Sequence, residues 1–443
     1  MDSLAETPNK RRSVTPLPNL LNHIVRFHRN VYLVFICSFI FGFILFGGLY
    51  QVLVNLFLIR MGYGTEFIGL VNGMSLLFLS LGSLCASVLG LRFSGLSLLR
   101  FGYVFYFVGI VLFPLAIYLP KFWQSSWLIG TNCLIGFMAA IFMVFLNPLV
   151  MASTTDEERN DVFSYQMAFM PFGGFVGSSF GGFFTYYLNV VYALPLNTPE
   201  PYVYTMLIGS SVMLIGIVAV FYLRPVDTST QEAEKRPSSD SSKNQDPFPL
   251  KIILLIAIVI TFRIAGEMSV RNFVNVYLDR DLYISPTRIS YVYSIAQLFA
   301  IPAPLIAPRL MKQFGRGQVF NWATMGVAGC VVAISMTQNW IAVTIAYVIL
   351  LALAQIARPA ITIISMQSVT PRWRPSMSSS NMISIGLSGL ATSMIGGFII
   401  DLWGFKPFFL TCAGVTMIGV AIFWFAFVKG STHQNEIDAE QHG

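Results

Sequence analysis

Four ionisable side chains stand out because they lie inside long apolar stretches of the sequence. Arg263, Glu267 and Arg271 follow one another at intervals of four residues, and Arg358 lies in a second stretch. On a helix, this spacing puts the first three on one face, about 6 Å apart along the axis. Guanidinium groups bind carboxylates and phosphates through two hydrogen bonds. Three cations against one carboxylate therefore indicate a binding site for an anionic or zwitterionic solute.

The single carboxylate of this set is also a candidate for proton coupling. Held between two arginines, Glu267 stays ionised until a bound anion competes for one of them. Two other interpretations stay open. Glu267 could serve only to neutralise Arg263 or Arg271 within the membrane, and Arg358 could serve only to hold backbone carbonyls at the bend that Pro359 permits.

Uncharged polar residues in the apolar stretches extend the candidate site. They are Gln51, Asn55, Asn72, Asn147, Gln297 and Gln355. All four histidines fall near the chain ends, which excludes a histidine proton relay within the apolar stretches. The five cysteines lack metal-ligand spacing, so we expect no metal site and no disulfide framework. Phosphate-loop and hydrolase motifs are absent from the sequence, and we expect neither enzymatic activity nor a cofactor.

The composition decides which solvent surrounds these residues. Of 443 residues, 55% are hydrophobic and only 11% are charged, whereas a soluble domain is about 25% charged. A soluble protein of this composition would expose far more apolar surface than water tolerates. We therefore expect a polytopic membrane protein whose surroundings are the lipid bilayer, with no nucleic-acid partner.

Segments long and apolar enough to cross a bilayer number twelve. Lipid cannot hydrogen-bond an open backbone, and the ten-residue alternation of a membrane barrel is absent, so each segment is predicted to be a helix. The predicted spans are 31–59, 66–90, 98–119, 125–151, 162–188, 202–223, 251–278, 286–310, 317–335, 340–367, 375–400 and 406–428.

A polar stretch rich in Ser, Pro and charge separates the sixth span from the seventh. It has too little apolar surface to fold alone. The sequence thus predicts two six-helix bundles joined by a flexible linker. The predicted parts are a tail at 1–30, a bundle at 31–223, the linker at 224–250, a bundle at 251–428 and a tail at 429–443.

Basic residues are distributed unevenly between the two sides of the predicted membrane. Nineteen of the 27 Lys and Arg residues fall on the side of the termini and the linker, and five fall in loops on the other side. Because cytoplasmic loops carry the excess of Lys and Arg, this predicts cytoplasmic termini in a multi-pass protein of the cell membrane.

The sequence also repeats itself. Residues 151–183 and 366–398 share 11 identities in 33 positions without a gap, and a weaker echo at an offset of 220 pairs Asn55 with Asn275. Since six is an even number, both copies enter the membrane in the same direction. We therefore expect parallel repeats, with a substrate path between them near the bilayer midplane.

The layout of six spans, a linker and six spans resembles the Major Facilitator Superfamily over residues 31–428. Two loop motifs add to the likeness. The loop after span two contains Arg92, and the loop after span eight contains Arg309 and ends in Arg316, although both lack the acid of the family motif G-x-x-x-D-R-x-G-R. The loop that ends in Arg159, and its repeat counterpart Arg374, could take over the gating contact.

Span five contains a stripe of small residues. Gly173, Gly177, Gly181 and Gly182 match the superfamily's antiporter motif G-x-x-x-G-P-x-x-G-G, with Ser178 in place of the proline. Small residues let two helix backbones approach closely. The stripe could therefore serve packing alone, with no bearing on the direction of transport.

Together these observations predict an all-α membrane protein with 12 transmembrane helices in two parallel six-helix bundles. The resemblance implies that spans one, four, seven and ten line a central cavity. We expect a monomeric secondary transporter that works by alternating access on a small anionic or amphipathic organic solute, with proton-coupled export as the favoured form. Alternatives are an uptake symporter for a small organic anion, a transporter-like receptor and a lipid-moving protein.

Overall fold

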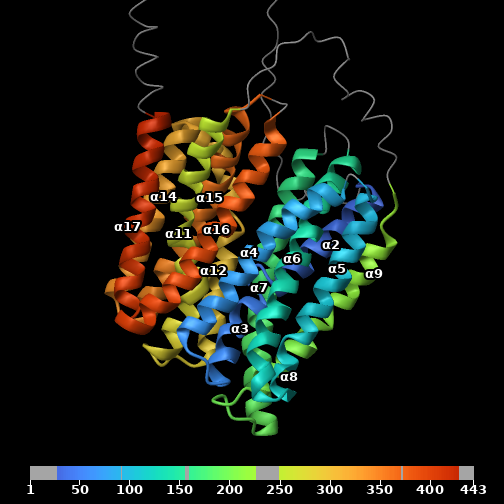
Figure 1. Cartoon of the computed structure of the whole chain (residues 1–443), viewed down its shortest axis with the longest axis vertical. Coiled ribbons are helices and arrows are strands. Elements are labelled where there is room, and N and C mark those ends of the chain that lie inside the picture. Colours follow the sequence, from blue (N-terminus) through green and yellow to red (C-terminus); the bar gives the residue numbers. More distant parts are fainter. Residues whose placement is uncertain (1–26, 91, 155–158, 226–248, 371–372, 429–443) are drawn as a thin grey trace, which may run out of the picture.

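A computed structural model describes residues 27–90, 92–154, 159–225, 249–370 and 373–428. All regular structure within these residues is helical (Figure 1). The predicted tails and most of the predicted linker lie outside the described residues.

The first half of the described chain forms spans 1 to 6. Its elements are α2 (Arg29–Ile44), α3 (Leu49–Arg60), α4 (Thr65–Leu89), α5 (Gly95–Leu112) continued by the 3₁₀ helix η1 (Pro114–Tyr118), α6 (Lys121–Ala152), α7 (Arg159–Tyr192), α8 (Glu200–Ser210) and α9 (Val212–Tyr222). Span 1 comprises α2 and α3, and span 6 comprises α8 and α9. The other helices form one span each.

The second half forms spans 7 to 12. Its elements are α11 (Leu250–Arg280), α12 (Pro286–Ala300), α13 (Ala303–Phe314), α14 (Arg316–Met336), α15 (Trp340–Gln367), α16 (Arg374–Trp403) and α17 (Phe405–Phe423), which ends in the π-helical turn η3 (Trp424–Val428). Span 8 comprises α12 and α13, which meet at an angle of 43°.

Ten helices of the described chain are long and apolar enough to cross a membrane, and the bent span 8 makes eleven. The twelfth predicted span corresponds to α7, which has 34 residues but is rich in Gly, Ser and Tyr. Helix α7 packs against α2 and α12, while Phe183 and Tyr186 on its remaining surface are exposed. The predicted all-helical fold of two six-helix bundles is confirmed.

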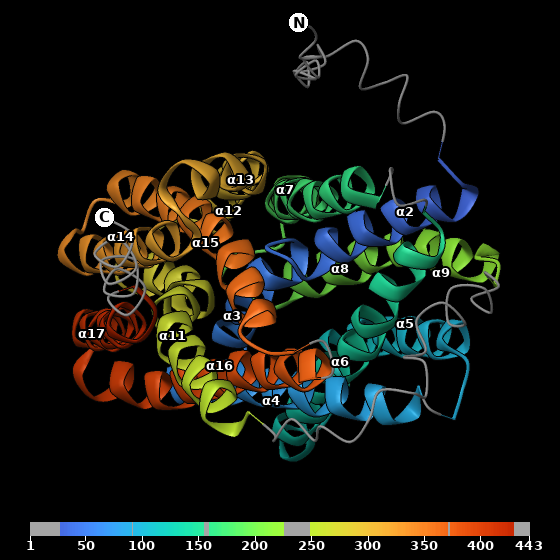
Figure 2. The same ribbon diagram turned by 90° about the horizontal axis from the view of Figure 1, so that it is seen from above.

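The two halves meet along two seams, where α4 packs on α16 and α7 packs on α12 (Figure 2). Glycines allow the close approach. A Cβ on Gly182 of α7 would lie 2.4 Å from Cβ of Ser290, and a Cβ on its repeat counterpart, Gly397 of α16, would lie 2.7 Å from the carbonyl oxygen of Thr65. Counterpart glycines thus pack against the second span of the opposite half, as a duplicated unit requires.

The ends of the described segments define two sides of the molecule. The start of α11 and the end of α17, which adjoin the segments outside the described residues, lie at the top of Figure 1, and this end is called the termini side. The loops 61–64 and 281–285 lie at the other end, called the opposite side. The ribbons of the two halves diverge toward the termini side (Figure 1).

Candidate functional site

Helix α11 carries three of the predicted site residues on one buried face. Nη2 of Arg263 donates to Oε2 of Glu267 over 3.1 Å, and Nε of Arg271 donates to Oε1 over 2.9 Å. The helix is unbroken from Leu250 to Arg280, so the four-residue spacing places both guanidinium groups within reach of the acid. The sequence predicts this geometry without help from other helices.

The fourth residue comes from α15. Nη2 of Arg358 donates to Oε1 of Glu267 over 2.8 Å, so this oxygen accepts hydrogen bonds from two guanidinium groups. Arg358 lies directly before Pro359, a proline inside the helix. Arg263, Glu267, Arg271 and Arg358 are called the charge cluster below.

Exposure differs strongly within the charge cluster. The side chains of Glu267 and Arg263 are 1% and 3% exposed, that of Arg271 is 10% exposed, and that of Arg358 is 39% exposed. With all four groups ionised, the cluster carries a formal charge of about +2. The excess charge is therefore reachable from solution at Arg358 and is otherwise buried.

An aromatic ring that the sequence analysis missed completes the site. Phe46 lies beneath two guanidinium groups, with the Cζ atoms of Arg271 and Arg358 each 5.6 Å from the ring centroid. Aromatic faces attract cations electrostatically. Phe46 thus ties span 1 to the charge cluster, although it makes no hydrogen bond through its side chain.

Phe46 reaches this place because span 1 is broken between α2 and α3. Gly47 has φ of +75°, and a Cβ there would lie 1.6 Å from Nε2 of Gln297 on α12. The candidate membrane span Arg29–Arg60 confirms the span predicted at 31–59. The sequence analysis did not foresee the interruption between α2 and α3 within this span. The pair Gly47-Gly48 in an apolar run is the signal that could have revealed it, since glycine readily adopts positive φ.

The uncharged candidates divide into two groups. Nε2 of Gln51 donates to the carbonyl oxygen of Arg271 over 3.3 Å. Nδ2 of Asn55 donates to Oδ1 of Asn275 over 3.0 Å and to the carbonyl oxygen of Asn272. Asn72 in turn donates to Oδ1 of Asn55 over 2.9 Å. These residues join the two halves beside the charge cluster.

Gln297 and Gln355 are buried elsewhere. Gln297 packs against Gly47 and Gly174, and within the described chain its Nε2 atom has no hydrogen-bond partner. Gln355 lies on α15 three residues before Arg358. The side chain of Asn147 lies outside the described residues.

The arginines predicted to gate transport lie on the termini side. Arg92, Arg309 and Arg316 are exposed, and Nη1 of Arg316 donates to Oε1 of Gln367 over 2.5 Å within the second half. The side chains of Arg159 and Arg374 lie outside the described residues.

The small-residue stripe of α7 faces two neighbours. A Cβ on Gly173 or Gly177 would lie 2.0 Å from the carbonyl oxygens of Phe39 and Phe43 on α2. A Cβ on Gly181 would lie 3.1 Å from Cδ1 of Leu49, and Gly182 faces α12. The stripe therefore sets the distance of α7 from span 1 and from the other half.

A polar seal closes the opposite side. Arg60 of α3 forms a bidentate ion pair with Asp279 of α11, with Nη1 to Oδ2 at 2.8 Å, and its Nε donates to the carbonyl oxygen of Leu196 over 3.0 Å. Nη2 of Arg280 donates to the carbonyl oxygen of Tyr63 over 2.9 Å. The Arg60–Asp279 and Arg280–Tyr63 contacts cross between the halves and hold the ends of α3 and α11 together, whereas the bond to Leu196 lies within the first half.

No cluster of metal-ligating side chains occurs within the described residues. Comparison with known families decides the protein's class. The model of the Major Facilitator Superfamily matches residues 66–265 and 256–442. The chain belongs to the Major Facilitator Superfamily. Members of this superfamily are membrane transporters, so this member is a multi-pass transporter.

Solved structures share the fold of this superfamily member at low identity. A nucleoside transporter, NupG, aligns with a TM-score of 0.70 and 12% identity over 90% of this chain and 100% of that chain. A D-xylose-proton symporter aligns with a TM-score of 0.72 and 12% identity over 89% of this chain and 97% of that chain. A bacterial homologue of the human lysosomal transporter Spinster aligns with a TM-score of 0.65 and 13% identity over 94% of this chain and 99% of that chain. Comparison with curated proteins gave no match.

Proposed function

We propose that this superfamily member moves a small organic anion across the membrane by alternating access, with the charge cluster as its binding site. The observation that carries the proposal is the ratio of three guanidinium groups to one carboxylate, all hydrogen-bonded together near the middle of the fold. The two surplus cationic groups can be satisfied by a carboxylate or a phosphate of the substrate.

The energetics favour an anion over a neutral solute. A charge at the centre of a bilayer costs about 2.5–3.5 kcal/mol or more, and the cluster keeps an excess of about two positive charges. A bound monoanion halves that excess, and a dianion cancels it. Substrate binding therefore lowers the cost of closing the two halves around the cluster.

The order of events follows from exposure. Arg358 is the accessible member, and it shares Oε1 of Glu267 with Arg271. An anion that arrives from solution meets Arg358 first and competes with Glu267 for both guanidinium groups. Glu267 keeps its bond to Arg263 through Oε2. Phe46, beneath the same two arginines, offers an apolar face to the rest of an amphipathic solute.

The polar seal between Arg60 and Asp279 supports a structure that is closed at the opposite side. The distribution of Lys and Arg favours cytoplasmic termini, so the closed side would be the outer face of the membrane. The break in span 1 then serves as a pivot. Segment α2 packs on its own half, whereas α3 carries the contacts to the other half.

Proton coupling fits the same geometry. In the absence of substrate, Glu267 accepts hydrogen bonds from three cationic groups, which stabilise its ionised form. Protonation becomes favourable once an anion has taken Arg271 and Arg358. We therefore propose that the proton binds together with the substrate and crosses the membrane in the same direction as the anion. By this route an outward proton gradient drives export, and an inward proton gradient drives uptake symport of the organic anion.

The experiment is a binding screen by thermal shift with small mono- and dicarboxylates, inorganic phosphate and small organic cations, followed by uptake of any hit into proteoliposomes. We expect anions to be hits, and Arg358→Ala to weaken them by roughly 10- to 150-fold, since a hydrogen bond to a charged group contributes about 1.5–3 kcal/mol. The matched control is Arg288→Ala, an exposed arginine of the same half. Hits confined to cations, or equal affinity in Arg358→Ala, would refute the proposal.

A further inference from the structure

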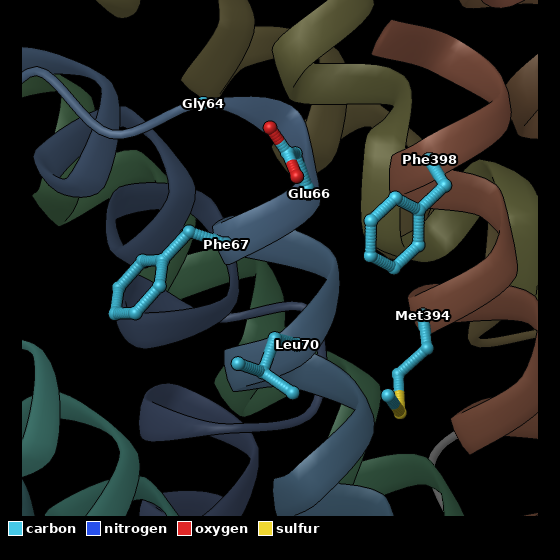
Figure 3. Close-up of a pocket in the computed structure, with 6 residues that line it drawn as sticks. All are labelled: Gly64, Glu66, Phe67, Leu70, Met394 and Phe398. Atoms are coloured by element: carbon cyan, nitrogen blue, oxygen red, sulfur yellow. The ribbon is translucent and has the colours of Figure 1, made fainter. Parts of the chain in front are cut away.

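A pocket away from the charge cluster lies where α4 meets α16, near the opposite side. It has a volume of about 310 Å³ (Figure 3). Its lining consists of Gly64, Glu66, Phe67, Leu70, Met394 and Phe398. One half of the molecule thus supplies the residues of α4, and the other half supplies Met394 and Phe398.

The pocket is polar at one end and apolar at the other. Glu66 lies in the first turn of α4, next to the loop 61–64, and Leu70 lies one helical turn further into the span. On α16, which runs in the opposite direction, Phe398 lies near the level of Glu66, and Met394 lies near the level of Leu70 (Figure 3). The carboxylate therefore sits at the membrane surface, and the apolar walls lead toward the bilayer interior.

The pocket opens to the outside of the bundle. Glu66 is exposed and Phe398 is 53% exposed. Behind them the seam is tightly packed, since a Cβ on Gly69 would lie 2.1 Å from the carbonyl oxygen of Ser393. The surroundings of such a groove in a membrane protein are the lipids of the adjoining leaflet.

The carboxylate of Glu66 at the opening of the pocket favours a cationic ligand. Within the described chain, the carboxylate of Glu66 has neither an ion-pair partner nor a side-chain hydrogen bond, although its place in a first helical turn is favourable for an acid. It is also the one charged group that lines the pocket. A ligand with a cationic head and an apolar body matches both ends.

We propose that this pocket binds a phospholipid with an amine headgroup. The ammonium group pairs with Glu66, and the upper part of an acyl chain lies against Phe398, Met394 and Leu70. The volume accommodates the headgroup and the beginning of a chain, while the remainder of the lipid stays in the bilayer. An ammonium N–H donor also allows a charge-assisted hydrogen bond to the carboxylate, which a quaternary ammonium headgroup cannot form.

Such a lipid contacts both halves at their seam. It therefore favours the arrangement in which α4 and α16 are packed together at the opposite side. This consequence depends on the rocking of the halves in the proposed function, whereas binding of the lipid does not.

The test measures lipid retained by the purified protein after extraction from vesicles of equal parts phosphatidylethanolamine, phosphatidylcholine and phosphatidylglycerol, by native mass spectrometry. We expect phosphatidylethanolamine to be enriched at least several-fold over the other two. Glu66→Gln should abolish the enrichment, and Met394→Trp, which fills the apolar end, should do the same. Glu200→Gln, an acid in the first turn of α8 near the same membrane surface, is the matched control and should leave it unchanged.

Three results would overturn the proposal: enrichment that persists in Glu66→Gln, equal retention of phosphatidylglycerol, and displacement of no lipid by Met394→Trp. Competition with a soluble alkylamine distinguishes the sources of the cation, because retention of the alkylamine without phosphatidylethanolamine would assign the pocket to amphipathic amines. Thermal unfolding and anion binding, measured on the same variants, report the fold and the charge cluster separately. Failure of the lipid site therefore leaves the proposed function standing or falling on its own data.

Discussion

Span 1 and span 7 occupy counterpart places in the two repeats, yet their middles differ. At the offset of 220 residues, Glu267 corresponds to Gly47, and Arg271 corresponds to Gln51. In span 7, helix α11 is continuous and carries the acid with its two arginines. In span 1, the helix breaks at Gly47, and the break brings Phe46 under the guanidinium groups.

The hydrogen bonds that join the two halves near the centres of spans 1 and 7 are symmetrical. Nδ2 of Asn55 donates to the carbonyl oxygen of Asn272, and Nδ2 of Asn275 donates to that of Val52, its counterpart by the same offset. Each repeat thus keeps the residues that join it to the other, while only the second keeps the charges. The comparison indicates that residues common to both repeats join the halves, and that the residues of the proposed binding site lie at positions where the two repeats differ.

The largest expected effect on stability comes from removing the carboxylate of Glu267 in span 7. Glu267→Gln leaves three guanidinium groups without a counter-ion, and removal of one partner of a buried ion pair costs about 3–5 kcal/mol. We expect a marked fall in the thermal unfolding temperature in detergent. Asp401→Asn, an exposed acid of the same half, should unfold at the temperature of the unsubstituted protein. Equal stability of Glu267→Gln and Asp401→Asn would mean that the charge cluster is not held by its acid.

A substitution at the break in span 1 should have the next largest effect. Gly47→Ala forces a side chain into positive φ, at about 1–2 kcal/mol, and overlap with the movable end of Gln297 adds about 1 kcal/mol. We expect reduced stability and slower transport, measured by thermal unfolding and by uptake into proteoliposomes.

The double variant Gly47→Ala with Gln297→Ala should recover the part of the lost stability that is due to overlap with the Gln297 side chain. Gly329→Ala, at a helical position with open space around it, is the control. Transport that is unaffected by Gly47→Ala would show that the break is not a pivot.

The smallest effects are expected at Asn55 and Asn275, the counterpart residues that join the two halves. Asn55→Ala and Asn275→Ala should each cost about 0.6–1.7 kcal/mol, the range for hydrogen bonds between membrane helices. Asn55→Ala should cost more, because Asn55 also accepts a hydrogen bond from Asn72, whose partner position in the second half is Val292. The double variant should cost less than the sum, since the two residues bond to each other. Strict additivity in a double-mutant cycle would contradict the reciprocal pairing.

Much of the fold could be predicted because it depends on composition and local period. The apolar runs, the forced helical backbone and the repeat at 151–183 and 366–398 are visible in the sequence. The face shared by Arg263, Glu267 and Arg271 follows from helix geometry alone. The break in span 1 escaped prediction, because an apolar run with two glycines is equally compatible with a continuous helix.

The sequence by itself determined that the protein is a duplicated helical bundle in lipid and that an acid lies between two arginines on one helix. These are consequences of solvent and of spacing within one element. The tertiary structure alone decided that Arg358, 91 residues away, binds the same acid, and that Phe46 lies beneath two of the arginines. Both depend on how separate helices are placed against one another, and no local pattern specifies that placement.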